Sequence, residues 1–89
     1  MQYLKIQAVE SNVNLEFYIE INDSRVEFRK VELAKGGLLG YASKDIQFHG
    51  TTLDKKPLLS LEELAKKHKV TELTKEEFEL IWNRALITK

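Results

Sequence analysis

Residues 15–21 read LEFYIEI, the most regular alternation of apolar and polar side chains in the sequence. Positions 15, 17, 19 and 21 are apolar, whereas glutamates occupy positions 16 and 20. Successive side chains of a β-strand point to opposite faces of its sheet. The segment is therefore predicted to be a strand with one apolar face and one polar face.

Similar runs lie before and after this segment. Leu4, Ile6 and Ala8 alternate with polar residues and predict an earlier strand. Residues 35–37 (KGG) predict a tight turn, because glycine adopts backbone conformations that other residues avoid. Residues 38–43 are then expected to return as a fourth strand.

The third run, which follows the turn after LEFYIEI, changes phase along its length. Val26 and Phe28 occupy even positions, whereas Val31 and Leu33 occupy odd positions. A shift of one residue would turn the second apolar pair to the opposite face of the sheet. The sequence therefore predicts a β-bulge near Arg29 and Lys30.

The second half of the chain carries helical signals instead. Residues 60–63 (SLEE) and 74–77 (TKEE) each match the capping-box pattern that begins a helix. After the second box, apolar residues recur at the helical period: Phe78, Ile81, Trp82 and Ala85. Helices are predicted over residues 60–70 and 74–87.

These elements predict an α+β fold. With 89 residues the chain has room for one core, so we expect a single domain over residues 1–89. Its sheet, a four-stranded antiparallel meander, would occupy residues 1–44, and a loop would follow over 45–59. The two helices would pack on one face, which would leave the other face free or covered by a partner.

Composition excludes several classes of protein. Apolar residues make up 43% of the chain and charged residues 31%, a balance that excludes wholesale disorder. No apolar run approaches the roughly 18 residues that span a bilayer, and no signal peptide is visible. Cysteine is absent, which excludes disulfides and thiolate metal sites. We therefore expect a cytoplasmic protein without a membrane partner.

The sequence offers few groups for catalysis. The two histidines, His49 and His68, are far apart and lack a second ligand at metal-binding spacing. His68 lies among lysines at a predicted helix end, where a solvated or helix-dipole-stabilising role is expected. No serine has the Gly-x-Ser-x-Gly context, and no glycine-rich segment has phosphate-loop spacing. We predict no enzyme, no catalytic residue, no metal site and no cofactor; an enzyme would need a concave pocket that holds His49 beside a carboxylate.

The polar face of the predicted sheet favours protein binding. Tyrosine and arginine are enriched at binding hot spots, and acidic residues around them would attract a basic partner. The alternative is a solvated face with scattered aromatic residues. The candidate contacts come from this face and from the loop that follows the sheet: Glu16, Tyr18, Glu20, Glu27, Arg29 and His49.

Nucleic-acid binding is the alternative function. The net charge of the whole chain is zero, whereas proteins that neutralise phosphates are usually basic. Residues 35–69 nevertheless carry seven cations and four anions, a net charge of +3. A nucleic-acid-binding or regulatory domain would use the lysine-rich segment 55–69.

Short motifs in order along the chain resemble a family of small uncharacterised bacterial single-domain proteins. The motifs are YLKI at 3–6, RKVE at 29–32, GYAS at 40–43, GTTL at 50–53 and EEFELIW at 76–82. Some small domains of this kind accompany polymorphic toxins as immunity proteins in contact-dependent growth inhibition. The resemblance therefore implies a protein that binds and neutralises a toxin domain, such as a nuclease. Separately, we expect a monomer, or a weak homodimer if the free sheet face is partly apolar.

Overall fold

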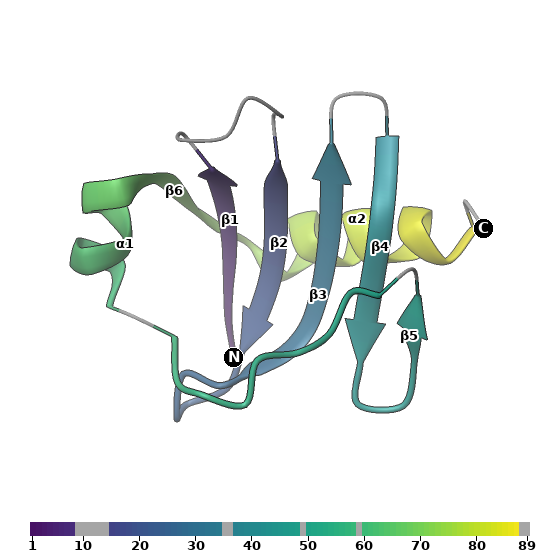
Figure 1. The fold of residues 1–89 in the computed structure, drawn as a ribbon, viewed down its shortest axis with the longest axis horizontal. Helices are drawn as coiled ribbons and strands as arrows, with labels where there is room; N and C mark the ends of the chain where they lie inside the picture. Colours follow the sequence, from purple (N-terminus) through teal and green to yellow (C-terminus); the bar gives the residue numbers. More distant parts are fainter. Residues whose placement is uncertain (9–14, 35–36, 49, 59, 88–89) are drawn as a thin grey trace.

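The structure, a computed structural model, describes residues 1–8, 15–34, 37–48, 50–58 and 60–87. These residues contain six strands and two helices (Figure 1). In chain order the elements are β1 (Gln2–Ala8), β2 (Glu16–Ile21), β3 (Glu27–Ala34), β4 (Gly37–Ser43), β5 (Gln47–Phe48), α1 (Leu61–Lys67), β6 (His68–Leu73) and α2 (Lys75–Ile87).

The strands form one antiparallel sheet in the order β5-β4-β3-β2-β1-β6. The α+β class and the meander of the first four strands are confirmed. Four strands were too few, because β5 and β6 extend the sheet at its two edges. The predicted loop 45–59 contains β5, which pairs with Tyr41 and Ala42 of β4.

Strand β6 lies where the sequence predicted the end of a helix. The predicted helix 60–70 begins as expected, since the side chain of Ser60 accepts a hydrogen bond from the Glu63 backbone N–H. It ends at Lys67, because the next six residues pair with β1. The second helix begins after Thr74, as the capping box predicts.

A β-bulge interrupts the pairing of β2 with β3. Glu20 lies opposite Arg29 and Ile21 lies opposite Glu27, which leaves Phe28 as the extra residue. The irregularity therefore lies next to the predicted position near Arg29 and Lys30. It turns Glu27 and Lys30 toward one face of the sheet and Arg29 toward the other, as their contacts show.

The first face of the sheet is covered by α2, which crosses behind the strands in Figure 1. We call the buried residues of this layer the aromatic cluster. Aromatic contacts join its members across the interface: the ring centroids of Tyr3 and Phe78 lie 5.3 Å apart, and those of Tyr41 and Trp82 lie 5.7 Å apart. The cluster consists of Tyr3, Tyr18, Val31, Tyr41, Phe78, Trp82 and Ala85.

The second face is covered by α1 and by the segment that precedes it. Their buried contacts form the aliphatic cluster, which consists of Leu4, Ile6, Ile19, Ile21 and Leu64. Leu58 packs against this cluster as the chain approaches α1. The prediction that both helices pack on one face is therefore wrong: the sheet carries an apolar cluster on each face, with one helix on each.

Candidate functional site

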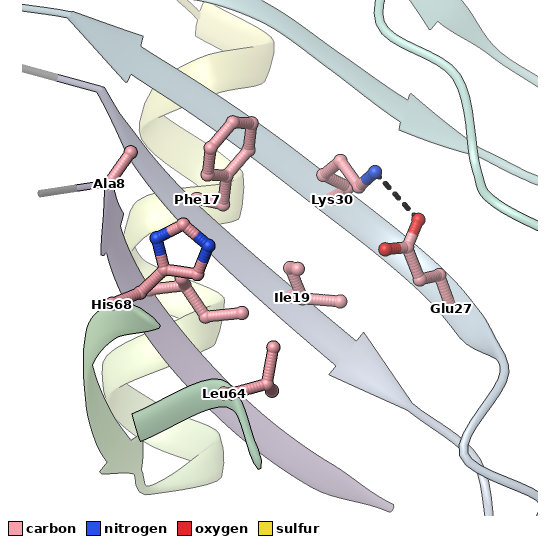
Figure 2. A pocket seen from close by; sticks show the side chains of 8 residues that line it. Ala8, Phe17, Ile19, Glu27, Lys30, Leu64 and His68 are labelled. Atoms are coloured by element: carbon pink, nitrogen blue, oxygen red, sulfur yellow. Dashed lines mark ion pairs between the residues drawn. The ribbon is translucent and has the colours of Figure 1, made fainter. Parts of the chain in front are cut away.

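The second face of the sheet is hollowed between α1 and the bulge in β3. The hollow measures about 210 Å³ and opens to the surface (Figure 2). Four elements of the sheet and α1 contribute side chains to it. The lining residues are Ile6, Ala8, Phe17, Ile19, Glu27, Lys30, Leu64 and His68.

The centre of the hollow is apolar. Ile6 and Phe17 lie opposite each other in neighbouring strands, and Ile19 is almost fully buried beside them. Helix α1 has only seven residues, of which Leu64 is the buried one. A helix of this length covers only part of the sheet face, so the apolar floor continues beyond it.

An ion pair lies at one end of the hollow. The Lys30 Nζ atom lies 2.7 Å from Glu27 Oε1, and both side chains are nearly buried. Lys30 also donates a hydrogen bond to the Thr52 carbonyl, while the Asp54 backbone N–H donates to Glu27 Oε1 at 2.7 Å. These bonds satisfy the buried charges and attach the segment before α1 to β3.

His68 forms the opposite end. Its backbone N–H closes α1 by donating to the Leu64 carbonyl, and its imidazole ring stands across from Phe17 and Ile19 in Figure 2. The Nδ1 atom is buried and has no hydrogen-bond partner in the described part of the chain. His68 thus lies at a helix end as predicted, but its ring lines the hollow and is only partly exposed, so the expectation of a solvated side chain is wrong. A buried polar atom without a partner is costly and calls for an explanation.

Three of the predicted contact residues lie beneath α2 instead of on a free face. Tyr18 and Glu20 are buried, and Arg29 lies between the carboxylates of Glu20 and Glu79. The guanidinium also stacks over Phe78, 4.9 Å from the ring centroid. The expected position on an open sheet face is wrong for these three residues, because α2 packs on that face.

The other three candidates are separated. Glu16 lies at the start of β2, where it pairs with Lys5 at 3.2 Å and accepts a hydrogen bond from Gln7. Glu27 lines the hollow. His49 lies outside the described residues. Of the five predicted residues that the structure describes, only Glu27 therefore belongs to the hollow.

The charges beneath α2 form a closed network. The hydrogen bonds that Arg29 donates to Glu20 and to Glu79 raise the pKa of Arg29 above its usual value, and the bond from Arg29 lowers the pKa of Glu79. Burial, followed by a hydrogen bond with Glu20, raises the pKa of Tyr3. Because each charge has an opposite charge beside it, this network joins the sheet to the helix.

The lysines of segment 55–69 come from three elements. Lys55 and Lys56 are exposed before α1, Lys66 and Lys67 are exposed on α1, and Lys69 is exposed on β6. A wide recess of about 670 Å³ includes the first two lysines, but Asp54 also lines it. Within the described ranges, no group of three or more histidine, aspartate or glutamate residues could hold a metal ion. No described helix is long and apolar enough to span a bilayer.

Sequence reasoning missed the hollow for a specific reason. Ile6, Phe17 and Ile19 have the alternation of an ordinary buried strand face, and nothing local shows that the face is only half covered. The one signal was the short distance between the two capping boxes, which leaves little chain for a long α1. Glu27 and Lys30 reach the same face only because of the bulge, whose exact residue the sequence did not identify.

Comparison with known proteins gives one match. A family model described as "Domain of unknown function (DUF6881)" matches residues 2–87. No curated protein and no solved structure matches the chain.

Proposed function

The chain belongs to the family of domains of unknown function DUF6881, and from this premise we propose that it is a protein-binding module whose hollow receives a side chain of its partner. The half-covered aliphatic face carries the proposal. Sites for small ligands usually measure about 300–1,000 Å³, so a hollow of about 210 Å³ is better suited to one side chain. Anchoring side chains in such pockets provide much of the affinity of protein interfaces.

The proposed partner is a bacterial toxin domain of the contact-dependent growth inhibition type, with nucleases among the candidate activities. In this proposal the chain acts in the cytoplasm as an immunity protein, alone or as a weak homodimer. An inhibitor acts by covering a site and needs no catalytic group of its own. Two features support this reading: the small size of the domain, and the pairing of Arg29, Glu20 and Glu79 into a structural network.

The first test compares the tagged wild-type chain with Ala8→Phe and Thr71→Phe in the cells that encode it. Ala8 lines the hollow, so a phenylalanine there fills the space without removing a core side chain. Thr71 is exposed and lies opposite Lys5 on the other face, so it provides a control of equal bulk. We expect the wild type and Thr71→Phe to retain one stoichiometric partner, and Ala8→Phe to bind it at least about tenfold more weakly.

The same proteins test immunity directly. The captured partner, expressed alone, should arrest growth; the wild-type chain and Thr71→Phe should restore growth, and folded Ala8→Phe should not. A partner that leaves growth unaffected contradicts the immunity proposal. Capture that survives Ala8→Phe, with its fold verified by circular dichroism, removes the hollow as the docking site.

The tagged wild-type chain, once purified, also tests nucleic-acid binding by segment 55–69. Five exposed lysines would give an affinity that falls steeply with added salt. We expect no binding of single- or double-stranded oligonucleotides at low salt. Salt-sensitive binding that is lost in Lys66→Gln/Lys67→Gln would favour this alternative over protein binding.

A further inference from the structure

The two ends of the hollow offer different hydrogen-bonding groups. At one end, the Lys30 ammonium uses two of its donors, on Glu27 and on the Thr52 carbonyl, which leaves a third donor. At the other end, His68 has a buried Nδ1 atom without a hydrogen-bond partner in the described residues. A buried N–H without an acceptor is rarer in proteins than an incompletely paired acceptor. The favoured tautomer therefore leaves Nδ1 unprotonated and places the proton on Nε2.

An occupant of the hollow must therefore combine an apolar body with a hydrogen-bond donor. The apolar centre, from Ile6 to Leu64, requires the body, and the unpaired Nδ1 atom of His68 requires the donor. A void of about 150 Å³ can hold one benzene ring, so about 210 Å³ has room for a ring with one substituent. Glu27 disfavours a carboxylate at the Lys30 end, because the lysine charge is already neutralised.

We propose that the hollow binds a phenol, and that the partner side chain is a tyrosine whose hydroxyl pairs with the imidazole of His68. This assignment rests on the proposed protein-binding function and names the chemistry of its anchor. The aromatic ring packs on Phe17 and Ile19, which face the imidazole in Figure 2. A phenol hydroxyl both accepts and donates, so it also satisfies the second tautomer of His68.

The experiment uses small analogues and needs no partner. The isotope-labelled full chain is titrated with p-cresol, which is the side chain of tyrosine, and with toluene, which lacks the hydroxyl. NMR spectra should show both compounds shifting the amides of Ile6, Phe17 and Leu64. One hydrogen bond should make p-cresol about three- to tenfold tighter than toluene. His68→Phe should abolish this preference, whereas Ala8→Phe should abolish the binding of both compounds.

Three outcomes would overturn the proposal. The first is equal affinity of the wild type for p-cresol and toluene, a measurement that depends on no variant. The second is tighter binding of p-toluate, which would make the hollow an anion site. The third is a titration in which only the amide NMR signals of the aromatic cluster shift. Selective p-cresol binding without capture of a protein partner would contradict the proposed function alone, so the two failures are distinguishable.

Discussion

Arg29 contacts both carboxylates and aromatic rings where the sheet meets α2. Its guanidinium binds Glu20 of the neighbouring strand and Glu79 of α2, and lies over the rings of Phe78 and Trp82 at 4.9 and 5.3 Å. Guanidinium groups favour such sites because their planar fork binds carboxylates while their faces stack on aromatic rings. Arg29 thus adds ionic and cation–π contacts to the aromatic packing that holds α2 on the sheet.

Removing Arg29 should therefore destabilise the fold strongly. Arg29→Met keeps the apolar volume but leaves Glu20, which is 4% exposed, buried without a cation. We expect a loss of roughly 3–5 kcal/mol in the free energy of unfolding, measured by urea denaturation. Arg29→Met/Glu20→Leu should recover most of that loss, since no unpaired buried charge remains. A double variant less stable than Arg29→Met would contradict this account.

Acid should weaken the contact between Arg29 and Glu79. The pKa of Glu79 is lowered in the folded state from its ordinary value of 4.5, chiefly by the hydrogen bond from Arg29. The stability that this bond contributes is therefore present above about pH 4.5 and is lost as the pH falls through the lower folded-state pKa. Glu79→Gln should have a lower urea midpoint than the wild type near neutrality, and the difference should shrink as the pH falls below 4.5 and through the lowered pKa of Glu79. A difference that is independent of pH would show that the lost contact is not ionic.

Among the elements, β6 shows most clearly what the sequence could not predict. Residues 60–67 and 74–87 carry their own start signals, so both helix starts were predictable from local chemistry. Residues 68–73 carry no comparable signal, because the lysines around His68 look like a helix end. Their strand conformation comes from pairing with β1, more than sixty residues away in the chain. The hollow was missed for the same reason, since its shape depends on where α1 ends.

The capping box of α2 should contribute measurably to stability. Thr74 Oγ1 accepts a bond from the Glu77 N–H at 3.1 Å, and the Glu77 side chain accepts one from the Thr74 N–H at 2.9 Å. Thr74→Ala removes the first bond and should cost about 1 kcal/mol of unfolding free energy. Ser24→Ala, at an exposed turn, is the matched control and should stay within about 0.5 kcal/mol of the wild type. Equal losses in the two variants would contradict a specific capping contribution.

At the scale of the whole molecule, the sheet is the middle layer between two apolar clusters. The sequence placed the aliphatic cluster correctly on one face of β1 and β2. It placed Tyr3 and Tyr18 on the polar face, to contact either a partner or solvent, because they share that side of their strands with charged residues. Their rings are buried beneath α2, as the amphipathic character of tyrosine allows. The face that was predicted to bind a partner is thus occupied by the protein's own helix.

Because both clusters share the same strands, we expect them to unfold together. Trp82 is the single tryptophan and lies 8% exposed in the aromatic cluster, so its fluorescence reports on that layer. Far-ultraviolet circular dichroism reports on the whole sheet. The two signals should give the same urea midpoint, as a cooperative domain of this size requires. An earlier fluorescence transition would show that α2 detaches while the sheet persists.

The order of the elements along the chain also affects how the protein is made. Strands β1 to β4 pair with the strand that follows each of them, so their hairpins can form as the chain leaves the ribosome. The aromatic face of the sheet acquires its cover only with Phe78 and Trp82, about 40 residues after Tyr41. At ordinary rates of synthesis this interval lasts roughly 2–8 s. During that time a nascent chain presents a tyrosine-rich surface that still lacks its helical cover.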